Sequence, residues 1–257
     1  MHSAGAHASL PKPPDASSVL YFIYGVDGDG ATSYEVQNGS VATFWYGHSF
    51  EVDGVGYYTG FAWATPEKYG KPGEDDVGPT STVTLSEATF TQTGKDPARP
   101  WVFKGMEWVV GEIGAYGKPS EIDTQRRPIE YTDASGKHLL ALPTTTFDAG
   151  NTLQSYDVLV FNPRYDQDKD GDYVWRHLGT VITGTDNAAE CDGGQAAACI
   201  SNQGTLSFEP AAGSEYPGIN VTRTGTIASG ADQTRALGPS DTQHYVYDAA
   251  RKTYLEK

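Results

Sequence analysis

The sequence predicts an all-β protein, either an antiparallel β-sandwich or a related multi-hairpin sheet assembly with few short helices. Thirty Gly and 15 Pro residues separate short runs that are rich in Val, Ile, Thr, Tyr, Phe and Trp. Turn dipeptides such as Asp-Gly recur between these runs, as is typical of antiparallel hairpins. With 16 Tyr, 9 Phe and 5 Trp among 257 residues, the chain has the apolar surface for a large core.

The strands are expected in hairpins joined by short turns. The first hairpin joins residues 19–26 to residues 32–37 across Asp27-Gly28-Asp29-Gly30. Further strands are expected at 129–133, 138–142, 155–161, 173–182, 205–209, 218–225, 244–247 and 253–255. Short helical turns are expected at 119–126 and 231–237, and a long surface loop at 66–79.

The clearest hairpin spans residues 43–63 and turns at Asp53-Gly54. This turn predicts the cross-strand pairs Val52–Val55, Phe50–Tyr57, His48–Thr59, Tyr46–Phe61 and Phe44–Trp63. The paired aromatic rings form the natural core face. Trp45 and Tyr58 fall on the opposite face, which is either a second buried layer or an exposed binding strip.

The domain organisation expected from the sequence is a spacer followed by one β-rich region. Residues 1–17 are small and Pro-rich, and we expect a flexible spacer of the kind that follows a removed signal peptide or a lipid-modified residue. Residues 18–257 form the β-rich domain, with a candidate division into two sub-domains at the turn-rich segment 147–153. No run approaches the roughly 18 apolar residues of a membrane-spanning helix.

The two cysteines, Cys191 and Cys199, are separated by seven residues that include two adjacent glycines. Such a loop is flexible enough to bring both Cβ atoms within bridging distance, so we expect a disulfide. A metal site and two unpaired buried thiols are the alternatives. Together with the spacer, a disulfide indicates an exported protein in an oxidising periplasmic or extracellular compartment.

The chain is strongly acidic, with 33 Asp and Glu against 18 Lys and Arg and a net charge of −15. Nucleic acid and anionic membrane surfaces are disfavoured as partners, because neutralising phosphates requires clustered basic residues. A cationic protein or a metal ion fits the sign of the charge better. The alternative interpretation is that the charge only keeps the chain soluble.

One loop has the composition of a calcium site. Four aspartates alternate with other residues in it: Asp166, Asp168, Asp170 and Asp172. Gly171 lets the backbone curl, so that several carboxylate oxygens can face one ion. An EF-hand is rejected, because the twelfth position is His177 instead of a bidentate Glu. A calcium loop between two strands therefore competes with a solvated hairpin tip, in which Asp and Gly are common.

For hydrolytic chemistry, the best carboxylate pair is Glu107 and Glu112, which lie among apolar residues that could raise one pKa. Their odd separation places them on opposite faces of a regular strand, so they converge only if Gly111 forms a bulge. The sequence has no nucleophile elbow, phosphate-binding loop, dinucleotide fingerprint or metal-binding His spacing. It therefore favours a non-catalytic protein.

Three C-terminal segments carry a family resemblance: GTLSFE at 204–209, GINVTRTG at 218–225 and HYVYDAARKTYL at 244–255. They resemble the closing strands of periplasmic lipoproteins of Gram-negative bacteria, some of which are immunity proteins against secreted antibacterial effectors. The resemblance covers about the last third of the chain and implies an exported immunity function. It carries over no functional residue.

These observations support an exported, non-catalytic binding protein. We expect an inhibitor or immunity protein that neutralises a cationic secreted enzyme or toxin by steric and electrostatic blockade. The alternative is a carbohydrate-binding module or a β-sandwich glycosidase, in which Trp45 and Tyr58 stack on sugar rings and Glu107 and Glu112 act on the bond. A structural role in the cell envelope or in adhesion is the third possibility.

Overall fold

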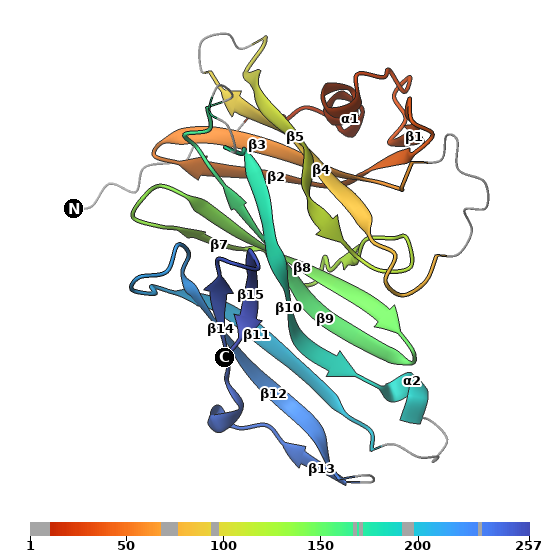
Figure 1. The fold of residues 1–257 in the computed structure, drawn as a ribbon, viewed down its shortest axis with the longest axis vertical. Coiled ribbons are helices and arrows are strands. Elements are labelled where there is room, and N and C mark those ends of the chain that lie inside the picture. The colour runs from red at the N-terminus through yellow and green to blue at the C-terminus, as the bar shows by residue number, and fades with distance from the viewer. Residues whose placement is uncertain are drawn as a thin grey trace. The chain divides into compact units, whose positions relative to one another are not determined.

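The computed structural model describes residues 11–67, 77–93, 98–166, 169, 172–191, 198–230 and 233–257. The chain divides into two compact units, Met1–Pro119 and Ser120–Lys257. Each unit is built on an antiparallel sheet, as Figure 1 shows, with few short helices. The all-β, antiparallel class expected from the sequence is confirmed. Within the described residues, no helix is long and apolar enough to span a membrane.

The first unit consists of one helix and a five-stranded sheet in the order β1-β2-β3-β4-β5. Its elements are α1 (Ala16–Tyr24), β1 (Ser33–Glu35), β2 (Val41–Val52), β3 (Val55–Ala64), β4 (Val83–Gln92) and β5 (Trp101–Ile113). Each strand pairs with the next in the chain, so the sheet is a simple meander with β1 and β5 at its edges. The sequence did not identify β4.

The β2–β3 hairpin turns at Asp53-Gly54, as expected, because both residues adopt positive φ (51° and 76°). The predicted pairs Val52–Val55, Phe50–Tyr57, His48–Thr59 and Tyr46–Phe61 are all present. The fifth predicted pair is wrong, since Phe44 lies opposite Ala62 and Trp63 lies opposite Thr43. Trp45 is the additional residue of a β-bulge at this point. The bulge turns Phe44 onto the opposite face, where it packs against the core beneath α1.

Residues 16–24 form a helix, so the strand expected at 19–26 is wrong. The Asp15 side chain accepts a hydrogen bond from the Ser18 backbone N–H at 2.8 Å and caps the helix N-terminus. Gly25 ends the helix with φ at 66°. A short apolar run does not by itself distinguish a helix from a strand; here the two caps favour a helix, and its packing on the sheet decides. The residues that the helix buries share one face: Val19, Leu20, Ile23 and Tyr24.

The helix α1 packs on one face of the sheet, against Tyr58, Ala62 and Phe90 among others. It comes close to β3 at Gly60, where a Cβ atom would overlap the Val19 side chain. Any side chain at this position would force the helix away from the sheet. The absence of a side chain at Gly60 therefore sets the distance between α1 and the sheet.

The second unit is built on a ten-stranded sheet with the main order β15-β14-β12-β11-β10-β9-β8-β6; β13 pairs with β12, and β7 with β8. Its elements are β6 (Glu121–Ile122), β7 (Ile129–Thr132), β8 (His138–Asp148), β9 (Asn151–Phe161), β10 (Trp175–Asp186), α2 (Ala188–Cys191), β11 (Ser201–Glu209), β12 (Gly218–Gly230), β13 (Gln233–Ala236), the 3₁₀ helix η1 (Pro239–Asp241), β14 (Gln243–Asp248) and β15 (Thr253–Glu256). Its buried core includes Leu139, Tyr156, Val158, Leu178 and Val221.

Two expectations for this part of the chain differ from the structure. Residues 147–153 do not separate two units, because they form the turn of the β8–β9 hairpin, whose strands pair from His138–Phe161 to Asp148–Asn151. The helical turns expected at 119–126 and 231–237 are replaced by the short strands β6 and β13. Pairing with β8 and β12 outweighs the weak local preference for a helix in segments this short.

We predict that Gly60→Ala destabilises the chain by about 1–3 kcal/mol, because the new methyl group overlaps the Val19 side chain. Urea denaturation of the full chain measures the effect. Val19→Ala in the same chain should relieve the overlap, so the double variant should lose less stability than the sum of the two single variants. Gly78→Ala is the control, since a Cβ atom there meets no atom within 4 Å. Wild-type stability of Gly60→Ala would refute the close approach.

Candidate functional site

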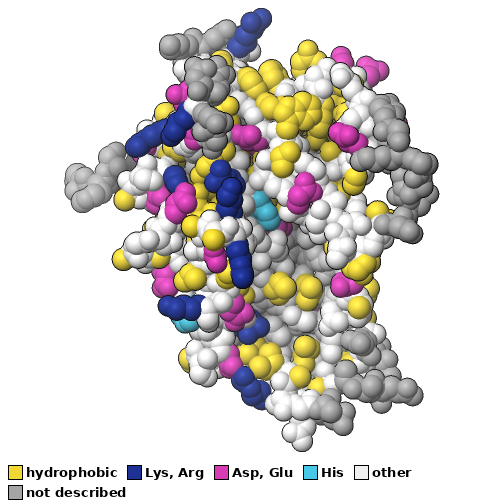
Figure 2. Space-filling model, in the orientation of Figure 1, with side chains coloured by type: hydrophobic (Ala, Val, Ile, Leu, Met, Phe, Trp, Pro, Cys, Tyr) yellow, Lys and Arg dark blue, Asp and Glu magenta, His cyan; other side chains and the backbone are white. Residues whose placement is uncertain are grey.

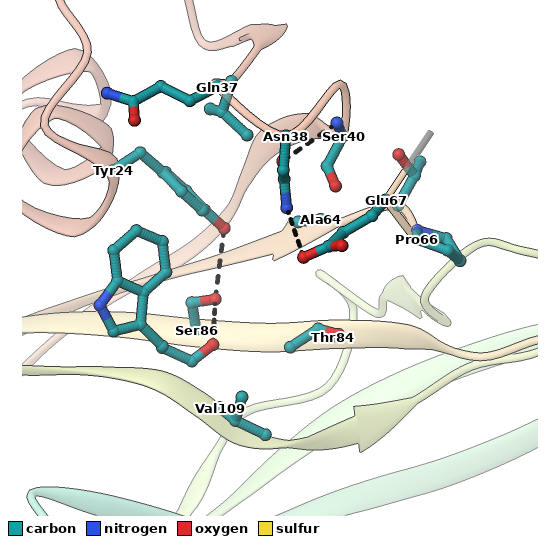
Figure 3. A pocket seen from close by; sticks show the side chains of 13 residues that line it. Tyr24, Gln37, Asn38, Ser40, Ala64, Pro66, Glu67, Thr84, Ser86 and Val109 are labelled. Atoms are coloured by element: carbon teal, nitrogen blue, oxygen red, sulfur yellow. Dashed lines mark hydrogen bonds between the residues drawn. The ribbon is translucent and has the colours of Figure 1, made fainter. Parts of the chain in front are cut away.

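The first unit contains a pocket of about 360 Å³, shown in Figure 3. It lies where the end of α1 and the β1–β2 connection meet the adjacent ends of β3, β4 and β5. Thirteen residues line it: Tyr24, Val36, Gln37, Asn38, Ser40, Ala64, Thr65, Pro66, Glu67, Thr84, Ser86, Trp108 and Val109. Figure 3 places Tyr24 and Ser86 on one side of the pocket and Asn38 and Glu67 on the other.

One wall is fixed by a chain of hydrogen bonds. The Ser86 hydroxyl donates to the Trp108 carbonyl at 2.8 Å, so the Tyr24 hydroxyl is left to donate to Ser86 Oγ, at 3.2 Å. Burial raises the pKa of Tyr24, which keeps this hydroxyl protonated as a donor. The Tyr24 and Trp108 rings meet edge-to-face at 5.4 Å.

Trp108 reaches this wall through an irregularity in β5. Leu85 pairs with Gly111 and Glu87 pairs with Glu107, so three residues of β5 lie opposite Ser86 alone. This three-residue bulge leaves the Trp108 side chain 55% exposed at the mouth of the pocket.

The other wall is a polar turn. The Ser40 backbone N–H donates to Asn38 Oδ1 at 3.2 Å, and Asn38 Nδ2 donates to Glu67 Oε1 at 3.3 Å. Among the described residues that line the pocket, Glu67 is the single carboxylate, and no basic side chain is present. The floor residue Thr84 donates to the Glu112 carboxylate at 3.0 Å, which adds a second negative charge beside the pocket.

Exposed aromatic side chains continue from the pocket along α1 and β5. We call Tyr21, Phe22, Phe103 and Trp108 the aromatic strip. The Phe22 and Phe103 rings stack at 4.9 Å, and Phe22 also meets the buried Phe90 edge-to-face at 5.1 Å. Figure 2 shows hydrophobic side chains gathered over α1 and the neighbouring part of β5, with acidic side chains at the margin. Contiguous exposed apolar surface of this kind marks interaction sites on proteins.

The second unit has a larger pocket, of about 490 Å³, but its central residue has structural partners. The Arg126 guanidinium donates to Asp123 at 2.6 Å and to the carbonyl oxygens of Thr144 and Ser155, and it lies over the Tyr156 ring. Since Arg126 joins three segments of its own unit, this pocket is a weaker candidate for a ligand.

The buried Asp157 in the same unit is likewise satisfied internally. Its carboxylate accepts hydrogen bonds from Thr180 at 2.6 Å and Thr144 at 3.1 Å, and His177 Nε2 lies 3.1 Å from Oδ1. A carboxylate with this many partners orders the interior and leaves no obvious position for a substrate.

The two binding residues expected from the sequence, Trp45 and Tyr58, lie outside the pocket lining. Tyr58 is buried beneath α1, so at this residue the face is the second buried layer and not the exposed binding strip. Burial raises the pKa of Tyr58 to about 12. Trp45 is the partly exposed bulge residue of β2.

The loop for which the sequence predicts calcium binding is described only in part, because Asp168 and Asp170 lie outside the described residues. Asp172 closes the loop, since its two carboxylate oxygens accept from the Asp166 backbone N–H at 3.0 Å and from Asn162 Nδ2 at 2.8 Å. Slight burial raises the pKa of Asp172, but the hydrogen bonds outweigh it and the net shift is downward. In the part of the chain that can be searched, no three acidic, His or Cys side chains converge on one point. Calcium binding stays a prediction.

The disulfide between Cys191 and Cys199 is present, with the Cα atoms 5.4 Å apart. It joins the end of α2 to the segment that leads into β11. The expectation from the spacing of the two cysteines is confirmed.

Glu107 and Glu112 do not converge. The β5 bulge adds two residues, which preserves the alternation of side chains, so the odd separation still places the two carboxylates on opposite faces. Glu112 faces the same side as Thr84 and the pocket, whereas Glu107 lies beside Glu87. The hydrolytic pair considered from the sequence is therefore not formed.

Glu87 is the unexpected carboxylate of this sheet. It is fully buried, and its pKa is raised well above the ordinary value of 4.5, first by burial and then by the nearby Glu107 charge. The Thr89 hydroxyl donates to Glu87 Oε2 at 2.6 Å and opposes the shift. Burial in the sheet therefore favours the protonated form of Glu87 over the charged form.

Sequence reasoning missed Trp108, Tyr24, Asn38 and Glu67. One signal was present for the first of them, because the run Trp108-Val109-Val110 interrupts strand alternation and is typical of a bulge. Nothing local links the other three, which come from the end of α1, the turn before β2 and the segment after β3.

No protein-family model, curated protein or solved structure matches this chain. Its function is therefore inferred from the chemistry of its own residues.

We predict that Glu87→Gln makes the stability of the chain less dependent on pH. Between pH 4.5 and the raised pKa, the unfolded chain releases a proton that folded Glu87 retains, so the wild-type free energy of unfolding falls as pH rises. This group contributes a slope of up to about 1.4 kcal/mol per pH unit. The variant cannot ionise at this position, so its stability relative to wild type should rise with pH.

Denaturation curves between pH 5 and pH 8 measure this difference. Glu51→Gln makes the same substitution at an exposed position of β2 and is the control. A constant difference between Glu87→Gln and wild type over this range would show that Glu87 is ionised in the folded chain.

Proposed function

We propose that this chain is a non-catalytic binding protein that recognises another protein through the aromatic strip, and that it serves as an inhibitor or immunity protein. The observation that carries the proposal is the exposure of Tyr21, Phe22, Phe103 and Trp108, which are 52%, 41%, 39% and 55% exposed. Large aromatic side chains dominate the binding energy of protein interfaces, because each buries much apolar area for little lost conformational freedom.

The position of the strip supports a protein partner. Within the described sheet, β5 is an edge strand that pairs only with β4. A partner can therefore cover the aromatic rings and approach the strand edge together. A sugar site needs one or two stacking rings, whereas this strip runs over a helix and a strand.

Charge supports a cationic partner. The chain carries a net charge of −15, which accelerates encounter with a basic protein and makes the complex sensitive to salt. The disulfide fits an oxidising compartment, and the resemblance of the C-terminal segments to periplasmic lipoproteins favours an immunity role. The proposed target is thus a basic enzyme or toxin of the bacterial envelope.

Carbohydrate binding is the second candidate function, and one observation favours it. Trp108 lines the same pocket as the Asn38 amide and the Glu67 carboxylate, and a stacking ring beside polar hydrogen-bonding groups is a common arrangement for sugars. Binding of a neutral sugar would survive high salt, which separates this candidate from the first.

The test is affinity capture of envelope and secreted proteins of Gram-negative bacteria on the immobilised full chain, at low and high salt. A retained protein is identified, purified and recombined with the chain, and its own activity is measured in the complex. We expect an equimolar, salt-sensitive complex in which the partner is inactive.

Two variants locate the interface. Phe103→Ala and Trp108→Ala should each weaken the purified complex by at least about tenfold, the size expected for an aromatic anchor. Phe147→Ala, an equally large change at a 65% exposed position of the second unit, should leave it unchanged. Equal affinity of all three variants, or retention of polysaccharide alone, would overturn the proposal.

A further inference from the structure

We propose that the pocket beside the aromatic strip binds an arginine side chain of the protein partner. This inference rests on the proposed function, to which it adds the chemistry that the pocket selects. An arginine needs a carboxylate for its charge, an aromatic face for its planar guanidinium and apolar surface for its methylene groups. The pocket lining provides all three.

The carboxylate is Glu67. It is exposed, and the only hydrogen bond to it in the described chain is the long one from Asn38 Nδ2 to Oε1, at 3.3 Å. No hydrogen bond to Oε2 is formed by the described residues. The described residues that line the pocket include no Lys, Arg or His, so none of them would repel a guanidinium.

The aromatic surface is Trp108. More than half of this side chain is exposed, while its contact with Tyr24 and the hydrogen bond from Ser86 to its carbonyl hold it in place. The indole has the strongest attraction for a cation of any side-chain ring. Because Arg is planar, it can stack on a ring and still donate in its own plane to a carboxylate, whereas the Lys ammonium offers only a point charge.

The remaining lining completes the site. Val36, Ala64, Pro66 and Val109 give apolar contact for the methylene groups. Behind the floor, Glu112 accepts hydrogen bonds from Thr82 at 3.1 Å and from Thr84 at 3.0 Å, and its charge adds to the negative potential felt in the pocket. A metal ion fits less well, because Glu67 is the single carboxylate among the described residues of the lining.

The test is an NMR titration of the isotope-labelled full chain with Nα-acetyl-arginine amide. The neutral citrulline analogue, the lysine analogue and a methyl glycoside are the comparison probes. The Trp108 indole signal is assigned by its loss in Trp108→Leu. We expect the arginine probe to shift this signal and the backbone signals of residues 38–40, and to bind at least about tenfold more tightly than citrulline, the ratio expected when a charge-assisted hydrogen bond is lost.

The variants separate charge from packing. Glu67→Gln and Trp108→Leu should each weaken binding of the arginine probe by at least about fivefold, and added salt should weaken binding to the wild type. Glu51→Gln removes the same charge near the opposite end of the β2–β3 hairpin and should have no effect. Equal binding of citrulline, insensitivity to Glu67→Gln, or tighter binding of the methyl glycoside would overturn the arginine assignment.

Failure of this inference is distinguishable from failure of the proposed function. If the arginine probe leaves the pocket signals unchanged while a captured partner still depends on Phe103, the pocket assignment is wrong and the protein interface stands. If the probe binds as expected but no inactivated protein partner is recovered, the pocket chemistry stands and the proposed function is wrong.

Discussion

The close approach of α1 to the sheet at Gly60 is the constraint on which the candidate site depends. Because Val19 lies directly over a residue without a side chain, the helix can bury its apolar face against β3 and β4. That position brings the Tyr24 hydroxyl within hydrogen-bonding distance of Ser86 and directs Tyr21 and Phe22 to solvent. A helix held further out would lose the hydrogen-bonded wall of the pocket and the support of the exposed rings.

The bulge in β5 has two consequences for function. It places Trp108 at the pocket, where the indole becomes part of both the aromatic strip and the lining. It also adds an even number of residues, so Glu107 and Glu112 stay on opposite faces and no hydrolytic pair forms. Glu107 instead lies beside the buried Glu87, whose interaction with Thr89 is internal to the sheet. One irregularity thus both supplies the pocket with an aromatic ring and keeps the two carboxylates apart.

In the proposed function, the aromatic strip and the pocket combine two kinds of recognition. The exposed rings give affinity through the area that they bury, and they are tolerant of the partner's detailed chemistry. The pocket is selective, because the Glu67 carboxylate must find a donor when a partner covers it and removes its water. An interface built in this way distinguishes a basic partner from other apolar surfaces, and the acidity of the whole chain speeds the encounter.

The sequence by itself determined the antiparallel all-β class, the Asp53-Gly54 hairpin with four of its pairs, and the disulfide between Cys191 and Cys199. Each depends on residues close in the chain, where turn chemistry and spacing decide the geometry. Only the tertiary structure decided that residues 16–24 are a helix and that Trp108 and Glu67 line one pocket. A short apolar run satisfies helix and strand alike until it has a surface to pack on, and strand registers with bulges depend on long-range pairing that no local pattern specifies.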